Sequence, residues 1–302
     1  MASINKTTAA PDTTVVSLGE MPRPTNQRRF LRAFLRNKIG VLGLVIVAVM
    51  IFSAVFAPVI SPYDPNKTNV RARLTPPNET FFLGTDEYGR DIFSRLLYGA
   101  SISLTIAVIA QTVSVGIGVT MGLISGWYGG WIDDLIMRLA DAVFALPGLI
   151  FLTVWVSILE PSKESIYLAL GLIGWAADAR MMRSQVLSLK EREYVIAARA
   201  MGASVPRIML RHLLPNGLAP TIVLASLGVA GIILTESGLS FLGLGVQIPN
   251  PSWGTMIDMG RNFTTSAWWY AVFPGLAIMI TVLGFNFLGD GLRDALDPTL
   301  YD

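Results

Sequence analysis

Long apolar stretches alternate with polar segments along this chain. A helix that crosses a bilayer needs roughly 20 mostly apolar residues, and we expect six such spans at residues 39–60, 101–125, 131–159, 166–182, 213–235 and 268–288. The fourth has the weakest pattern, because Trp175, Asp178 and Arg180 interrupt it. The pattern therefore predicts an all-α membrane protein with six transmembrane helices.

The composition agrees with this prediction. Of the 302 residues, 52% are hydrophobic and only 15% are charged, whereas soluble domains are about one quarter charged. The absence of cysteine excludes a disulfide framework, a thiolate zinc site and an iron–sulfur cluster. The single histidine, His212, cannot build a metal site alone. We expect no metal, no bound cofactor and no catalytic residue on this chain.

Basic residues gather in two segments and indicate the orientation. Six lysines and arginines lie between Arg23 and Lys38, and seven lie between Arg180 and Arg211. Cytoplasmic loops carry an excess of such residues, so we expect both segments and both chain termini to be cytoplasmic. Residues 61–100 carry five basic and five acidic residues, and we expect them outside the cell.

Four segments follow from these patterns. Residues 1–22 are polar without an apolar period, which predicts a disordered cytoplasmic tail. Residues 23–61 are predicted to form a basic helix and the first transmembrane helix. Residues 62–99 are predicted to form an extracytoplasmic loop, with a short helix at 91–98 lying at the membrane surface. Residues 100–302 are predicted to form a core of five transmembrane helices.

Several residues within the spans suggest how the helices pack. Three glycines recur every fourth residue near the end of the second span, which lets another helix approach closely: Gly118, Gly122 and Gly126. Three charged residues share one face at the start of the third span and are predicted to pair with one another: Asp134, Arg138 and Asp141. Glu236, at the outer end of the fifth span, is predicted to pack at a helix end.

The polar segment between the fourth and fifth spans is predicted to form two short helices. Residues 188–201 are good helix formers, and Gly202 fits a helix end that needs a positive φ. Ser204 can cap a second helix with Pro206 in its first turn. A loop that only signals topology needs no such helices. A DNA-reading helix-turn-helix does not suit a segment joined to spans at both ends.

The residues around Gly202 resemble the EAA loop of the permease subunits of binding-protein-dependent ABC importers. That pattern is Glu-Ala-Ala, three residues, Gly, nine residues, Ile, any residue and Leu-Pro. Ile196 and His212 replace its Glu and Ile. The resemblance implies that residues 188–212 form a cytoplasmic coupling loop. The coupling residues are then Tyr194, Ala197, Ala198, Arg199, Gly202, Leu214 and Pro215.

Other segments resemble the C-type permeases of dipeptide and oligopeptide importers. They are FLGTDEYGRDIFSR at 82–95, LSFLGLG at 239–245, SWGTM at 252–256 and GDGLRDALDP at 289–298. The resemblance covers residues 32–298 and implies the type I ABC importer permease (MetI-like) fold in a bacterial inner membrane. Nickel and glutathione importers share these segments, so the substrate stays open among these classes.

The chain has no Gly-x-x-x-x-Gly-Lys-Ser/Thr phosphate loop with which to bind ATP. An active transporter of this kind therefore needs partner subunits, and the resemblance implies which ones. It implies a transport subunit that is not an enzyme. Its partners would be a second permease subunit, two ATPase subunits that bind ATP and magnesium, and an extracytoplasmic peptide-binding protein, with no nucleic acid. Four charged residues are candidates for docking that binding protein, although they can equally pack over the outer end of the bundle: Asp86, Arg90, Asp91 and Arg95.

Two other classes of membrane protein fit less well. A metal-dependent intramembrane protease needs His-Glu-x-x-His, which one histidine cannot supply. A serine-type intramembrane protease needs a base beside its serine, and none is placed near Ser237 or Ser240. An aspartyl-type protease needs two aspartates together in the membrane, whereas Asp64 and Asp290 are predicted to lie on opposite faces of the membrane. A secondary transporter would show inverted repeats and broken helices, and no such repeat is visible in the sequence.

Overall fold

The structure is a computed structural model that describes residues 26–159 and 162–296. Within these ranges the chain forms helices and a single isolated β-bridge between Thr85 and Asp91. The all-α prediction is therefore confirmed. The predicted tail at residues 1–22 lies outside the described residues.

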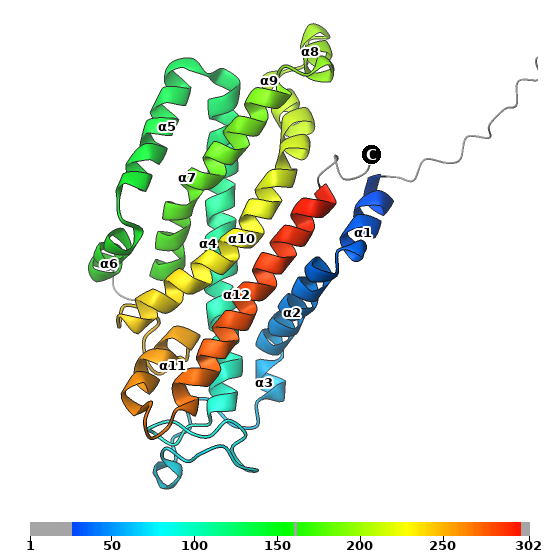
Figure 1. Ribbon diagram of the computed structural model, residues 1–302. Helices are drawn as coiled ribbons and strands as arrows, with labels where there is room; N and C mark the ends of the chain where they lie inside the picture. Colours follow the sequence, from blue (N-terminus) through cyan, green and yellow to red (C-terminus); the bar gives the residue numbers. More distant parts are fainter. Residues whose placement is uncertain (1–25, 160–161, 297–302) are drawn as a thin grey trace, which may run out of the picture.

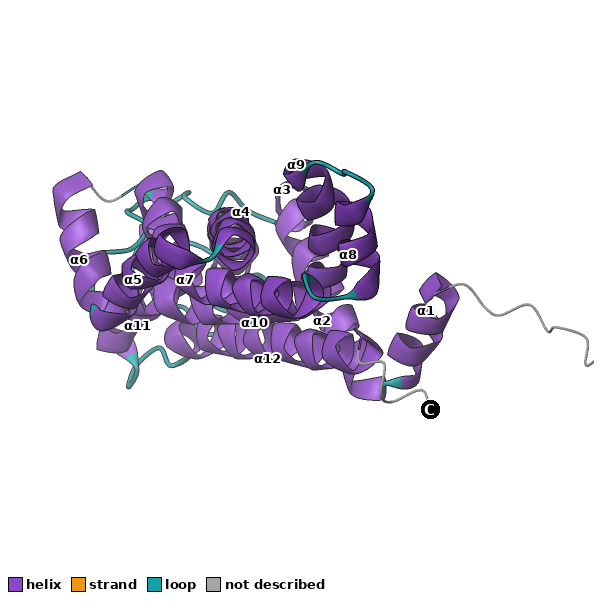
Figure 2. Ribbon diagram, turned by 90° about the horizontal axis from the view of Figure 1, so that it is seen from above, coloured by secondary structure: helices purple, strands orange, loops and turns teal. Residues whose placement is uncertain are grey.

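Five long helices run beside one another (Figure 1): α2 (Lys38–Val55), α4 (Ile92–Tyr128), α7 (Lys163–Leu189), α10 (Leu214–Phe241) and α12 (Trp269–Leu296). The shorter helices are α1 (Asn26–Arg36), α3 (Ala57–Ile60), α5 (Gly130–Ala145), α6 (Gly148–Leu159), α8 (Glu193–Ala200), α9 (Val205–Ile208) and α11 (Trp253–Gly260). In Figure 1, α8, the start of α1 and the end of α12 lie at one end of the bundle, and α11 lies at the other. Seen from above in Figure 2, α5 and α6 flank one side and α1 lies at the opposite side.

Four helical segments are long and apolar enough to cross a membrane: Lys38–Val55, Ile92–Tyr128, Val205–Phe241 and Trp269–Leu296. The pair α5 and α6 adds a fifth if it counts as one span. Helix α7 does not meet this criterion, and it contains the polar residues that interrupt the fourth predicted span. The chain is thus a multi-pass membrane protein, and the total of six spans stays a prediction.

The prediction of one continuous helix at 131–159 is wrong. The segment is divided into α5 and α6, which meet at an angle of 89°. Pro147 follows Leu146, whose backbone is extended with φ −84° and ψ 128°. Proline disfavours the helical conformation in the residue before it, so α5 ends there.

The outer loop ends earlier than the predicted boundary at residue 99. Helix α4 begins at Ile92, because the Asp91 carboxylate caps it by accepting a hydrogen bond from the Ser94 N–H at 2.7 Å. The expected separate surface helix at 91–98 is instead the first part of this 37-residue helix.

The basic segment from Asn26 to Arg36 forms a separate helix, α1, before α2. Asn37 divides α1 from α2 and caps α2 by accepting a hydrogen bond from the Gly40 N–H at 2.9 Å. Its amide nitrogen also donates to the Asp294 carboxylate at 2.7 Å. The start of α2 is therefore attached to the end of α12.

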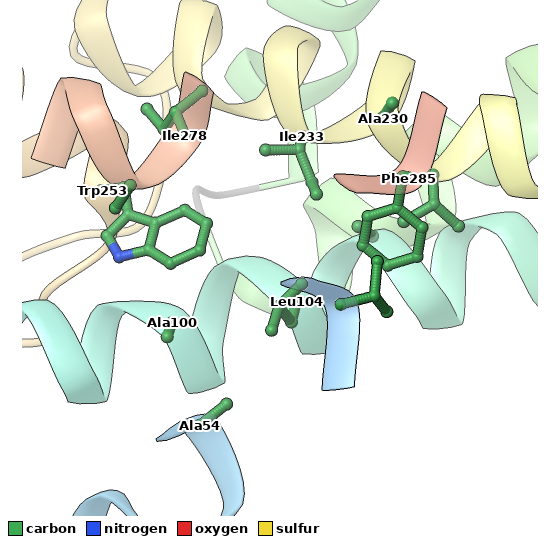
Figure 3. Packing of buried hydrophobic residues seen from close by; sticks show 12 residues of the cluster. Ala54, Ala100, Leu104, Ala230, Ile233, Trp253, Ile278 and Phe285 are labelled. Carbon is green, nitrogen blue, oxygen red and sulfur yellow. The ribbon is translucent and has the colours of Figure 1, made fainter. Parts of the chain in front are cut away.

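A shared core holds together the part of the bundle next to α11 (Figure 3). Apolar side chains from α2, α4, α10, α11 and α12 converge there, including Ala54, Leu104, Ile233, Trp253 and Phe285. Trp253 is 1% exposed, and its indole N–H donates to the Leu96 carbonyl at 3.1 Å. This contact fixes α11 against α4.

The predicted close helix approach occurs between α4 and α7. A Cβ added at Gly122 would lie 2.5 Å from the Ala179 carbonyl oxygen, and one added at Gly126 would lie 2.7 Å from the Val186 Cβ. Real side chains do not approach so closely. The glycine stripe of α4 therefore lets the two backbones meet.

Candidate functional site

Helix α8 ends in a sharp elbow at Gly202. The Ala203 N–H donates to the Ala198 carbonyl at 3.1 Å, and the Gly202 N–H donates to the Arg199 carbonyl at 3.0 Å. These two bonds form the Schellman motif that ends many helices. Gly202 has φ +80°, so the predicted glycine with a positive φ is confirmed.

The helices on either side differ in part from the prediction. The expected helix at 188–201 is divided, because α7 continues to Leu189 and α8 begins at Glu193. Ser204 takes the N-cap position of α9 and Pro206 lies in its first turn, although the Ser204 side chain makes no capping hydrogen bond in the described structure.

A π-helical turn, Met209–Leu213, joins α9 to α10. The Leu214 N–H bonds to the Met209 carbonyl, one residue farther back than in an α-helix. This wider turn directly precedes Pro215, which has no N–H to donate. Such turns occur often at functional sites.

The elbow is anchored to the bundle by a small apolar core. Val195 of α8 and Ile208 of α9 are 0% and 1% exposed. They pack with residues of α4, α7 and the π-helical turn: Leu123, Met182, Val186 and Leu213. The Arg199 guanidinium also lies 4.7 Å above the Trp127 ring of α4. A displacement of α8 would therefore be transmitted through this core to α4, α7 and α10.

The opposite face of α8 is open and mainly apolar. Tyr194, Ile196 and Met201 are 42%, 51% and 82% exposed, and Ala197 is exposed beside them. The resemblance implied that both alanines are coupling residues, but Ala198 is 4% exposed and faces its own chain. The helical period separates the two alanines, so only Ala197 is open to a partner.

The remaining elbow residues lie close by. Leu214 is half-buried and Pro215 is exposed at the start of α10. The His212 ring lies 6.3 Å from the Tyr194 ring. His212 therefore packs against α8.

The four candidate docking residues of the outer loop are buried. Asp86, Arg90, Asp91 and Arg95 are at most 3% exposed. Arg90 pairs with the Asp86 carboxylate at 2.6 Å, and Arg95 approaches the same carboxylate at 3.6 Å. Burial raises the pKa of the Asp91 carboxyl, against hydrogen bonds from Ser94 that lower it. This burial favours the packing interpretation, and contact with a binding protein stays a prediction.

Replacing Asp86 with alanine is expected to destabilise the protein by about 3–5 kcal/mol, because it removes the carboxylate that pairs with two buried guanidinium groups. Thermal unfolding of the detergent-purified variant measures this. Glu79→Ala, in an exposed part of the same loop, is the matched control and should melt like the wild type. Equal melting temperatures for both variants would contradict the role given to Asp86.

Glu236 is buried at the junction of α4, α10 and α11. Its carboxylate accepts from the Ser240 hydroxyl at 2.8 Å and from the Ser103 hydroxyl at 3.3 Å. The Ser103 oxygen in turn accepts from the backbone N–H of Trp253 at 3.4 Å. Every partner belongs to a packed helix, which supports the predicted packing role.

Charges of α5 pair with α7 instead of with one another. Asp133 accepts hydrogen bonds from both ends of the Arg183 guanidinium, with a Nε to Oδ1 distance of 2.6 Å. Asp141 pairs with Arg180. The expected pairing within the Asp134, Arg138 and Asp141 set is corrected accordingly. Sequence spacing favoured partners within one helix and gave no sign of the neighbouring helix.

A cavity of about 760 Å³ opens along the middle of the bundle between α4, α6, α7 and α10. Its walls are mainly leucine, isoleucine and glycine. Gln111, Ser114 and Asp178 supply a polar spot in this apolar lining. In the sequence, Asp178 is visible only as an interruption of a span, and nothing there indicates this group.

A bundle of long apolar helices, with an exposed helical elbow at one end and a cavity along its middle, defines the class of membrane permease subunits. This chain belongs to the family of binding-protein-dependent transport system inner membrane components, whose family model matches residues 118–301. The model of the N-terminal TM domain of oligopeptide transport permease C matches residues 26–77.

Relatives agree over most of the chain. It is 46% identical over 282 residues to the dipeptide transport system permease protein DppC of Escherichia coli, covering 91% of this chain and 94% of that protein. It is 43% identical over 267 residues to the oligopeptide transport system permease protein OppC of Bacillus subtilis, covering 88% of each. The recognition of a dipeptide and oligopeptide type permease is confirmed.

A solved structure shares the fold. A chain of the inward-facing MetNI methionine ABC transporter matches with a TM-score of 0.53 and 18% identity, covering 67% of this chain and 97% of that chain. At this identity the likeness supports the MetI-like fold alone.

Proposed function

We propose that this chain forms half of the translocation pore of an ATP-driven importer of di- or oligopeptides in a bacterial inner membrane. A second permease subunit forms the other half. Two ATPase subunits bind ATP and magnesium, and an extracytoplasmic binding protein delivers the peptide. The family and the peptide-permease relatives support this assignment. The open apolar face of α8 on an anchored elbow is the observation that carries the coupling role.

The elbow transmits the motion of the ATPases in this proposal. Tyr194, Ile196 and Met201 enter a cleft on an ATPase, while Val195 holds α8 to the bundle. Closure of the ATPase pair then moves α8, and the small core passes that motion to α4, α7 and α10. Access to the cavity would switch from one membrane face to the other.

The orientation follows from the same arrangement. The α8 end carries the start of α1 and the end of α12 (Figure 1). With that end in the cytoplasm, the basic segments obey the positive-inside rule and α11 faces outward. Six spans are required, with α7 as one of them and α5 and α6 together as another. The paired charges between α5 and α7 compensate for the polarity of α7.

Affinity purification of the tagged chain in mild detergent tests this proposal. Mass spectrometry should find a second permease and one or two ATPases, and the complex should hydrolyse ATP in a vanadate-sensitive way. Peptide uptake by the reconstituted complex tests the substrate class. Purification without an ATPase in several detergents would contradict the proposal and favour a secondary transporter.

The double replacement Ile196→Asp and Met201→Asp should release the ATPases and keep the second permease bound. Two carboxylates would then have to enter an apolar contact without partners. Pull-down yields measure the loss. Val70→Asp, at an 80% exposed apolar residue of the outer loop, is the control and should retain all subunits. Retention of the ATPases by the double variant would exclude α8 as their contact.

A further inference from the structure

One carboxylate in the middle of the bundle takes no part in the proposed coupling of α8 to the ATPases. Asp178 lies near the middle of α7 and is 2% exposed. Its Oδ2 accepts from the Ser114 hydroxyl at 2.6 Å and faces the Gln111 amide nitrogen at 3.5 Å. Its Oδ1 has no hydrogen-bond partner among the described residues. Ionisable residues at this depth usually mark the path of a substrate or ion.

No cation within the described ranges neutralises this carboxylate. The two nearby arginines of α7 are already engaged, since Arg180 pairs with Asp141 and Arg183 pairs with Asp133. Asp178 is thus the unpaired acidic group of the cavity wall. A buried carboxylate without a counter-charge is expensive, and a ligand cation would relieve that cost.

The cavity of about 760 Å³ leaves room for such a ligand, and its wall is closely packed beside Asp178. Gly174 and Gly228 line the cavity beside the polar spot. A Cβ at Gly174 would lie 3.1 Å from the Ser114 Cβ, and one at Gly228 would lie 2.8 Å from the Gln111 Cδ. The missing side chains therefore let Ser114 pack closely against α7 and Gln111 against α10. The other lining residues are mainly apolar and suit side chains of varied shape.

We propose that Asp178, supported by Gln111 and Ser114, binds the N-terminal ammonium group of a peptide in transit. This inference rests on the proposed peptide import. An ammonium group has three N–H donors and no acceptor, which suits a carboxylate whose Oδ1 has no hydrogen-bond partner among the described residues. A single carboxylate in an apolar cavity recognises the N-terminal ammonium group that peptides share and makes no specific contact with their side chains.

Uptake by the complete transporter, expressed in cells without other peptide importers, tests the inference. Asp178→Asn keeps the shape and an acceptor for Ser114 but removes the charge. Uptake of a tripeptide with a free amino group should fall about tenfold, because the ammonium group loses its hydrogen bond to a charged partner. Ser114→Ala keeps the charge and should reduce uptake less. Uptake at the wild-type rate by Asp178→Asn would overturn the inference.

Cross-linking separates binding from a structural role. A carbodiimide activates a carboxyl group, a primary amine displaces it to form an amide, and the carbodiimide leaves as a urea. Labelled tripeptide should couple to Asp178 in the wild-type complex and not in Asp178→Asn, and an N-acetylated tripeptide should not couple. A transporting complex without this adduct, or loss of subunits in Asp178→Asn, would overturn the inference. A wild-type complex that assembles with its ATPases but takes up no peptide would overturn the proposed function as well.

Discussion

Replacing Gly202 with valine is expected to lower peptide uptake about tenfold or more while the helix bundle stays folded. Gly202 has φ +80°, a conformation that costs an L-residue about 1–2 kcal/mol and is a severe outlier for a β-branched one. A strain of about 1.4 kcal/mol changes an equilibrium tenfold. The elbow can relieve it only by breaking the Schellman hydrogen bonds, which turns α8 away from its docking direction.

The surroundings of Gly202 make this test specific. A Cβ at this position meets no atom within 4 Å, so the variant creates no clash and a loss of uptake arises from the backbone. Gly202→Asn is the matched control, because asparagine tolerates a positive φ, and it should retain most of the uptake. Vesicle uptake and membrane content would be measured for both variants. Equal uptake by the two would contradict an angle-setting role for this glycine.

The sequence predicted those features that depend on local chemistry. Gly202 was recognisable because a glycine after a helical run marks a left-handed helix end. The stripe of Gly118, Gly122 and Gly126 was recognisable because its spacing puts bare backbone on one helical face. Both features follow from residues close together in the chain, and the structure contains both.

Features that depend on distant partners were missed or misplaced. Asp178 became part of a polar group only because α4 brings Ser114 and Gln111 beside α7. The salt bridge from Asp133 to Arg183 likewise joins two helices. Pro147 was visible in the sequence as a residue that ends helices, but the long apolar run around it favoured one continuous helix at 131–159. Periodicity describes one helix at a time, so it cannot assign contacts between helices.

Replacing Gly122 with leucine is expected to lower the amount of folded protein. A Cβ there would lie 2.5 Å from the Ala179 carbonyl oxygen and 2.7 Å from the Met182 Cβ. Backbone cannot yield as a flexible side chain does, so α4 and α7 must separate, at a cost of about 1–3 kcal/mol or more. That separation would also break the contact between Ser114 and Asp178.

Gly116→Leu is the matched control for this variant, because Gly116 lies on the same helix and a Cβ there meets no atom within 4 Å. Size-exclusion chromatography after graded heating measures the remaining folded protein. Gly122→Leu should aggregate at a lower temperature than the wild type, whereas Gly116→Leu should elute unchanged. If both variants were equally stable, the α4 and α7 backbones would have to lie farther apart than the structure places them, and the polar spot around Asp178 would lose its geometric basis.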